Sequence, residues 1–243
     1  MGSAYQKPYL GSPSGMFPFG VKWLLISNTA IFLFQFILYQ GLGVSLNFLK
    51  LIPSQTVTGY IWQPFTYMFL HDVHGSGHIL WNMVVLFLTG PMLEQHLGTA
   101  RFLKYYILCG IGAALCVAIV SFGLNAQQTA VIGCSGAIFG ILIAIGVLLP
   151  NVLFFGIIKA KWFVTIIGVA TVVDGIASRN SGVSHVAHLG GMLIGFLVLR
   201  FGLLGGSSKS SDPFASVQTL YRNYKLARAR KKFEVYMRDN TRH

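Results

Sequence analysis

The chain has 243 residues, of which 54% are hydrophobic and only 10% are charged, whereas soluble domains carry about 25% charged residues. This composition excludes an ordinary soluble enzyme, and apolar segments of about 17 residues or more are long enough to cross a bilayer as helices. The net charge is +12, and nine of the eighteen lysines and arginines lie from Lys209 onward, which beside a membrane domain is typical of a tail near anionic lipid rather than of nucleic-acid binding.

Six membrane spans are predicted in chain order, so we expect an all-α polytopic fold. The spans cover residues 23–40, 78–93, 102–122, 135–150, 162–176 and 185–204. They form one membrane domain over residues 21–204, between an N-terminal tail over residues 1–20 and a basic C-terminal tail over residues 205–243. Residues 221–237 of that tail alternate charged and aromatic side chains, which predicts an amphipathic surface helix. The aromatic-rich connection over residues 41–77 is expected to form short interfacial helices or a re-entrant segment buried in protein.

The distribution of lysine and arginine predicts the orientation of the spans. With both termini in the cytoplasm, sixteen of these residues lie inside and only Lys50 and Arg179 lie outside, which is a strong positive-inside signal. The spans that begin near His78, Ser135 and His185 then all enter the membrane from outside, so their polar side chains lie at one depth. Because no transit peptide or cleavable signal peptide is recognised, we expect a plasma or inner membrane.

Two matching pairs of small residues predict a close contact between the fourth and sixth spans. The segments Gly136–Gly140 and Gly191–Gly195 are both GxxxG motifs, which let membrane helices approach backbone to backbone. A serine and a histidine need such an approach, because a hydrogen bond requires a separation of about 3 Å. Ser135 directly precedes the first motif, and His188 lies three residues before the second on the same helical face. We therefore predict a nucleophilic serine with a histidine base.

His78 and Asn82 are four residues apart and so share one face of a helix. Both side chains can donate hydrogen bonds. Donors beside a nucleophile suit an oxyanion hole, whereas the same pair elsewhere would serve as a polar clamp between helices. Both interpretations stay open on the residues alone.

The remaining polar residues suggest a different class of function and bear on a catalytic triad. A metal transporter could use five histidines, which are His71, His74, His78, His185 and His188. The HExxH motif of zinc enzymes is, however, missing.

The two acids in or near the spans are Glu94 and Asp174. We expect Glu94 to accept hydrogen bonds from loop amides near Gly98, and Asp174 to be solvated. Neither acid fits a third triad member, so a serine–histidine dyad is preferred and no metal or other cofactor is expected.

Four ordered pieces of sequence, taken together, resemble the rhomboid family of intramembrane serine proteases. They are His78–Asn82, Glu94 followed by Leu97-Gly98, Gly133–Gly136, and Ala187–Gly191, and the resemblance runs from about Trp62 to Gly202. It implies a six-helix core with a water-filled active site open to the outer side. It also implies Ser135 as nucleophile, His188 (rather than His185) as general base and then acid, and an oxyanion hole formed by the Ser135 N–H with the side chains of His78 and Asn82.

The chain departs from the family pattern at two positions. Gln63 follows Trp62 where the family often has arginine, so a loop-bracing ion pair is not expected. Phe139 stands where a tyrosine often stacks on the catalytic histidine; phenylalanine can still stack but lacks the hydroxyl. The resemblance implies single-span membrane proteins as substrates, met within the lipid bilayer. A non-catalytic member of the same fold that binds membrane helices is the main alternative.

Overall fold

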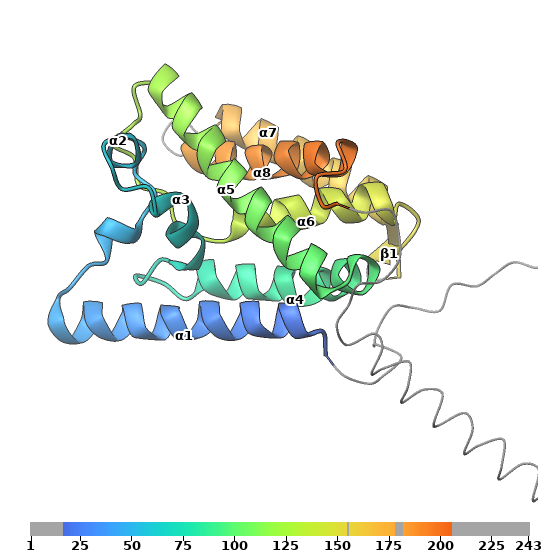
Figure 1. Ribbon diagram of the computed structural model, residues 1–243, viewed down its shortest axis with the longest axis horizontal. Coiled ribbons are helices and arrows are strands. Elements are labelled where there is room, and N and C mark those ends of the chain that lie inside the picture. Colours follow the sequence, from blue (N-terminus) through green and yellow to red (C-terminus); the bar gives the residue numbers. More distant parts are fainter. Residues whose placement is uncertain (1–16, 155, 178–181, 206–243) are drawn as a thin grey trace, which may run out of the picture. The chain divides into compact units, whose positions relative to one another are not determined.

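The computed structural model describes residues 17–154, 156–177 and 182–205. The predicted tails and the amphipathic helix over residues 221–237 lie mostly or wholly outside these residues. The described part of the chain contains six long helices, one at each predicted span, and Figure 1 shows their arrangement. Their bounds are α1 (Phe19–Leu42), α4 (Gly77–Leu97), α5 (Thr99–Gly123), α6 (Ser135–Leu148), α7 (Ala160–Ala177) and α8 (Gly182–Arg200).

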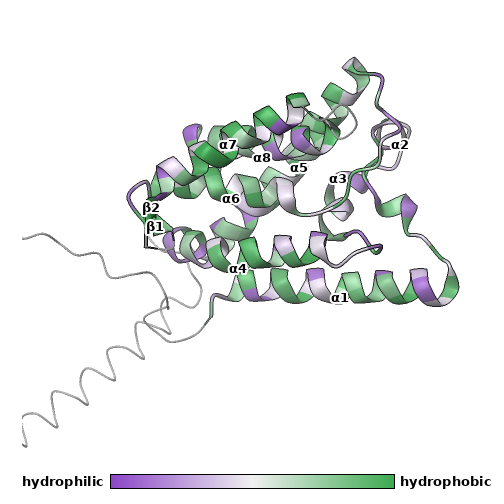
Figure 2. Cartoon of the chain, turned by 180° about the vertical axis from the view of Figure 1, so that it is seen from behind, coloured by the Kyte–Doolittle hydropathy of each residue, from purple (hydrophilic) through white to green (hydrophobic). Residues whose placement is uncertain are grey.

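The length and hydropathy of the helices support a membrane protein, but not a count of six spans. Within the described residues, four helices are long and apolar enough to cross a bilayer: α1, α5, α7 and α8. The helix α6 is apolar but has only 14 residues, and α4 has 21 residues but carries His78, Asn82 and Glu94. Figure 2 shows hydrophobic residues along α1 and α7 as well as along α6. Many of the large exposed side chains on α1 are accordingly apolar, such as Leu33, Phe34 and Ile37.

The connection between α1 and α4 contains the short helices that the sequence predicts. They are η1 (Asn47–Leu49), α2 (Pro53–Val57), α3 (Gln63–Thr66) and η2 (Tyr67–Phe69). An isolated antiparallel bridge between Leu51 and Val131 ties this connection to the segment that leads into α6. The connection therefore packs against the start of α6.

Gln63 braces this connection with hydrogen bonds in place of an ion pair. Its side-chain oxygen accepts hydrogen bonds from the Ile52 N–H at 3.1 Å and from the Thr56 hydroxyl at 2.8 Å. Its amide nitrogen donates to the side-chain oxygen of Gln55 at 3.0 Å. Because Gln63 is fully buried, the loop is held by a neutral network that carries no desolvation penalty for a charge.

The segment between α6 and α7 contains two short strands, which the predicted all-α fold does not include. A short antiparallel hairpin, β1 (Leu153–Phe154) and β2 (Ile158–Lys159), separates the two helices. The helix α6 ends at Leu148, two residues before Pro150, because the residue before a proline is disfavoured in helical geometry. The helix α7 begins at Ala160, directly after β2.

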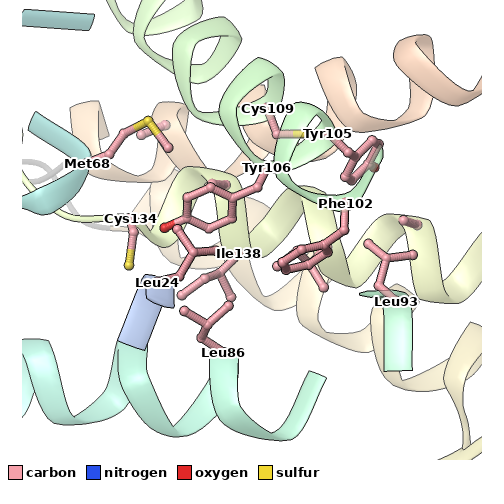
Figure 3. Close-up of a cluster of buried hydrophobic side chains, with 14 of the residues drawn as sticks. Leu24, Met68, Leu86, Leu93, Phe102, Tyr105, Tyr106, Cys109, Cys134 and Ile138 are labelled. Atoms are coloured by element: carbon pink, nitrogen blue, oxygen red, sulfur yellow. The ribbon is translucent and has the colours of Figure 1, made fainter. Parts of the chain in front are cut away.

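The buried core lies around α6, which packs against α4, α5, α7 and α8. Figure 3 shows Phe102, Tyr105 and Tyr106 of α5 gathered with Leu86 of α4 and Ile138 of α6. Glycines bring the backbones together. A Cβ atom at Gly191 would overlap the carbonyl oxygen of Gly136. The predicted close approach of the fourth and sixth spans is thus confirmed.

Glu94 stabilises the start of α1. Its carboxylate accepts hydrogen bonds from the Gly20 N–H at 2.8 Å, the Val21 N–H at 2.7 Å and the Thr99 hydroxyl at 2.7 Å. The expectation of loop amides near Gly98 was wrong, because the Gly98 N–H already donates to the backbone oxygen of Glu94 and ends α4. The first N–H groups of a helix have no intrahelical acceptor, and they favour a negative charge.

We expect Glu94→Gln to destabilise the fold by about 1–3 kcal/mol, because the buried N–H groups of α1 would lose a charged acceptor. The measurement is thermal unfolding in detergent. Thr99→Val, which removes only one of the three donors, should cause a smaller loss. Cleavage by folded molecules should change little, because Glu94 lies about 24 Å along α4 from His78 at 1.5 Å per residue. Equal melting temperatures for wild type and Glu94→Gln would contradict this account.

Candidate active site

The turn before α6 places Ser135 at the first position of the helix. Gly133 has a φ of 110°, a conformation that glycine adopts without strain. Its N–H donates to the backbone oxygen of Tyr67 at 2.9 Å, which fixes the turn against the connection described above. The N–H of Ser135 belongs to the first turn of α6, whose N–H groups have no intrahelical acceptor.

Ser135 and His188 meet across the contact between α6 and α8. The Ser135 hydroxyl and Nε2 of His188 are 2.8 Å apart, although the two residues are 53 positions apart in sequence. Both side chains are half-buried. The contact depends on the absence of side chains at Gly136 and Gly191, where α6 and α8 touch backbone to backbone.

Phe139 holds the ring of His188 from one side. It lies one helical turn after Ser135, and its ring stacks on the imidazole with centroids 4.3 Å apart and an interplanar angle of 2°. The phenylalanine therefore supplies the stacking surface without a hydroxyl.

His78 and Asn82 lie beside the turn that carries Ser135. The Asp72 N–H donates to Nδ1 of His78 at 3.3 Å, so in the neutral ring Nε2 carries the hydrogen. A Cβ atom at Gly133 would lie 2.8 Å from Nε2 of His78 and 3.8 Å from Nδ2 of Asn82. Asn82 is buried and gives one amide hydrogen to the backbone oxygen of His78 at 2.9 Å. Its second amide hydrogen remains for another acceptor.

His185 is held by α7 rather than by the serine. Its Nε2 lies 2.6 Å from the carboxylate of Asp174. The expectation that Asp174 is simply solvated was therefore wrong, although the aspartate side chain is 67% exposed. The rings of His185 and His188 contact edge to face at 6.2 Å, so His185 contacts both the aspartate and His188.

The other two histidines have separate environments. His71 is fully buried, and its ring lies 5.2 Å from that of His78. Burial, and secondarily the neighbouring His78, lowers the pKa of His71 to about 4, so its ring is neutral at neutral pH. His74 is exposed and contacts the ring of Tyr39. Within residues 17–154, 156–177 and 182–205, no three His, Cys, Asp or Glu side chains are grouped so that they could hold a metal ion.

Sequence reasoning missed one residue near this site. Gln35 of α1 is 5% exposed and hydrogen-bonds both backbone groups of His71. The signal was available, because a polar side chain inside an apolar span is costly unless it has a partner.

Comparisons with known proteins give matches to rhomboid proteins. A family model described as the Rhomboid domain matches residues 58–204, which is more than half of the chain. YdcA of Bacillus subtilis is 35% identical over 155 residues, covering 59% of this chain and 72% of that protein. Rhomboid protease AarA of Providencia stuartii is 30% identical over 199 residues, covering 72% of this chain and 69% of that protein. RHOMBOID-like protein 1 of Arabidopsis thaliana is 34% identical over 143 residues, which is only 33% of its length.

Proposed function

The chain belongs to the rhomboid family of intramembrane proteases, and on that premise we propose that it is a serine endopeptidase with Ser135 as nucleophile and His188 as base. The hydrogen bond of 2.8 Å between the two side chains supports this proposal most strongly. A serine hydroxyl is a weak nucleophile until an adjacent base accepts its proton.

The reaction follows from this pair. Nε2 of His188 accepts the hydroxyl proton while Oγ of Ser135 attacks the carbonyl carbon of the scissile bond. His188 then returns the proton to the leaving amine, and an acyl-enzyme remains. Water, deprotonated by the same imidazole, hydrolyses that ester and restores both side chains.

The negative charge on the tetrahedral intermediate needs hydrogen-bond donors that are already in position. We assign the Ser135 N–H, Nε2 of His78 and Nδ2 of Asn82 to this role. The bond from the Asp72 N–H supports it, because it leaves the hydrogen of neutral His78 on Nε2. Loss of one such donor costs about 10²–10³-fold in kcat in serine proteases.

The base is oriented without a carboxylate of its own. The stacking of Phe139 on His188 favours one ring orientation, and the carboxylate of Asp174 lies 2.6 Å from Nε2 of His185. This arrangement supports a dyad rather than a triad.

The substrates in this proposal are single-span membrane proteins, cleaved within or near their membrane helix. A helix engages its carbonyls in hydrogen bonds, so cleavage should favour sites where glycine, proline or polar residues let it unwind. The enzyme itself is an integral membrane protein. We place it in a plasma or inner membrane with both termini cytoplasmic, and its protease domain at residues 21–204.

A fluorophosphonate probe tests the proposal, because it reacts covalently only with an activated serine. Purified protein in detergent should be labelled on Ser135, and Ser135→Ala should not be labelled. Absence of labelling in folded wild-type protein would favour a non-catalytic protein that binds membrane helices. Stoichiometric zinc or copper in the same preparation would favour the histidine-based metal transporter.

A further inference from the structure

The polar side chain of Gln35 lies buried in a helix that is otherwise mostly apolar and peripheral. Its neighbours Phe34 and Phe36 are 58% and 40% exposed, whereas Gln35 is 5% exposed. Its amide nitrogen donates to the backbone oxygen of His71 at 2.9 Å, and its oxygen accepts the His71 N–H at 3.2 Å. One amide thus satisfies both backbone groups of a single residue, as a neighbouring β-strand would.

This clamp is connected to the oxyanion side of the site by one residue. The next residue after His71 is Asp72, and its N–H donates to Nδ1 of His78. That bond selects the tautomer of His78 and orients Nε2 toward the turn at Gly133. The position of the Asp72 N–H depends on the His71 backbone, which Gln35 holds.

From these contacts we infer that Gln35 is a positioning residue for the reaction: it holds His71, so that Asp72 keeps His78 aimed at the oxyanion. The inference rests on the proposed function. It assigns a role in the chemistry to α1, whose side chains lie outside the dyad itself.

The contacts of the His71 side chain make the site sensitive to any movement of His71. Its ring is fully buried against His78, and its Nε2 lies 3.9 Å from Sγ of Cys134, the residue before the nucleophile. Without Gln35, the N–H and C=O of His71 would be buried without partners, and the loop would have to shift to satisfy them. Such a shift would also move His78 and the turn that carries Ser135.

Gln35→Leu tests the inference, because it removes both hydrogen bonds at similar volume. A misplacement of catalytic groups by about 1 Å can cost 10²-fold, so we expect kcat to fall roughly 10- to 100-fold with KM within about twofold. The assay uses the full chain and a fluorescent single-span substrate. Asn28→Leu is the matched control, since Asn28 is equally buried in α1 but bonds the Leu24 backbone oxygen of its own helix. It should keep kcat within about threefold.

A double-mutant cycle with His78→Gln separates positioning from general stability. If Gln35 acts through His78, Gln35→Leu should lower kcat in the wild-type background and have almost no further effect in the His78→Gln background, measured at high enzyme concentration. The same loss in both backgrounds, or unchanged kcat in the single variant, would overturn the inference. If wild-type protein cleaves no faster than Ser135→Ala, the proposed function fails instead.

Gln35→Glu provides a second variant if Gln35→Leu does not fold. A neutral glutamic acid side chain keeps one acceptor for the His71 N–H and one donor for the His71 carbonyl oxygen. The ionised side chain has no donor and presents only acceptors to that carbonyl oxygen. The kcat of this variant relative to wild type should therefore fall as pH rises. The fall should disappear in the His78→Gln background. A ratio that is independent of pH, or a fall that persists without His78, would contradict the positioning role.

Discussion

Ser135→Ala and His188→Ala are each expected to lower kcat for cleavage of a membrane-helix substrate by about four orders of magnitude or more. The two side chains act as one unit, because the hydroxyl attacks only while the imidazole accepts its proton. The double variant should therefore be no slower than either single variant. Substrate binding should be kept, since neither truncation changes the oxyanion donors or the close contact of Gly136 with Gly191.

Neighbouring residues supply matched controls for both variants. Ser184 is exposed near the start of α8, and His185 is paired with Asp174. Ser184→Ala should cleave at the wild-type rate, and His185→Ala should retain activity within about tenfold. Initial rates in detergent, together with melting temperatures, are the measurement. Cleavage by Ser135→Ala, or equal losses for His185→Ala and His188→Ala, would refute the assignment.

Gly191→Ala is expected to impair both stability and catalysis. The added Cβ atom would overlap the carbonyl oxygen of Gly136, so α6 and α8 would have to move apart. Overpacking of this kind costs about 1–3 kcal/mol. The same movement lengthens the Ser135–His188 hydrogen bond, and we expect kcat to fall by at least about tenfold.

Gly41→Ala is the control for this variant. Gly41 is also helical, but a Cβ atom there would meet nothing within 4 Å. Its melting temperature and kcat should stay at the wild-type values. The measurements are thermal unfolding and initial rates on the same preparations. Wild-type activity in Gly191→Ala would show that the close contact is dispensable for the reaction.

The elements of the fold that were predictable are those that leave a local signal. Apolar runs predicted the six long helices, and the aromatic-rich connection predicted short ones. The GxxxG motifs predicted the contact of α6 with α8, because glycine spacing reports directly on how near two backbones can lie. The hairpin between α6 and α7 was missed, since two-residue strands have no periodic pattern.

The partners of the buried or paired polar side chains were less predictable, because the two residues of each pair are far apart in sequence. Glu94 bonds the N–H groups of Gly20 and Val21, more than seventy positions earlier. Asp174 contacts His185 because α7 and α8 pack side by side. In both cases the sequence shows that a polar group needs a partner, but tertiary packing decides which one. Gln35 is a third example, because its partner is the backbone of His71.

The position of His188 in α8, the last helix of the described residues, has a consequence for biosynthesis. A nascent chain that has inserted α1 to α6 already carries Ser135, His78 and Asn82, but on the proposed assignment it has no base. The histidine arrives only when α8 enters the membrane and docks on α6 through Gly191. Proteolytic activity would then begin only once the domain is complete, so partly translated chains could not cleave their neighbours in the membrane.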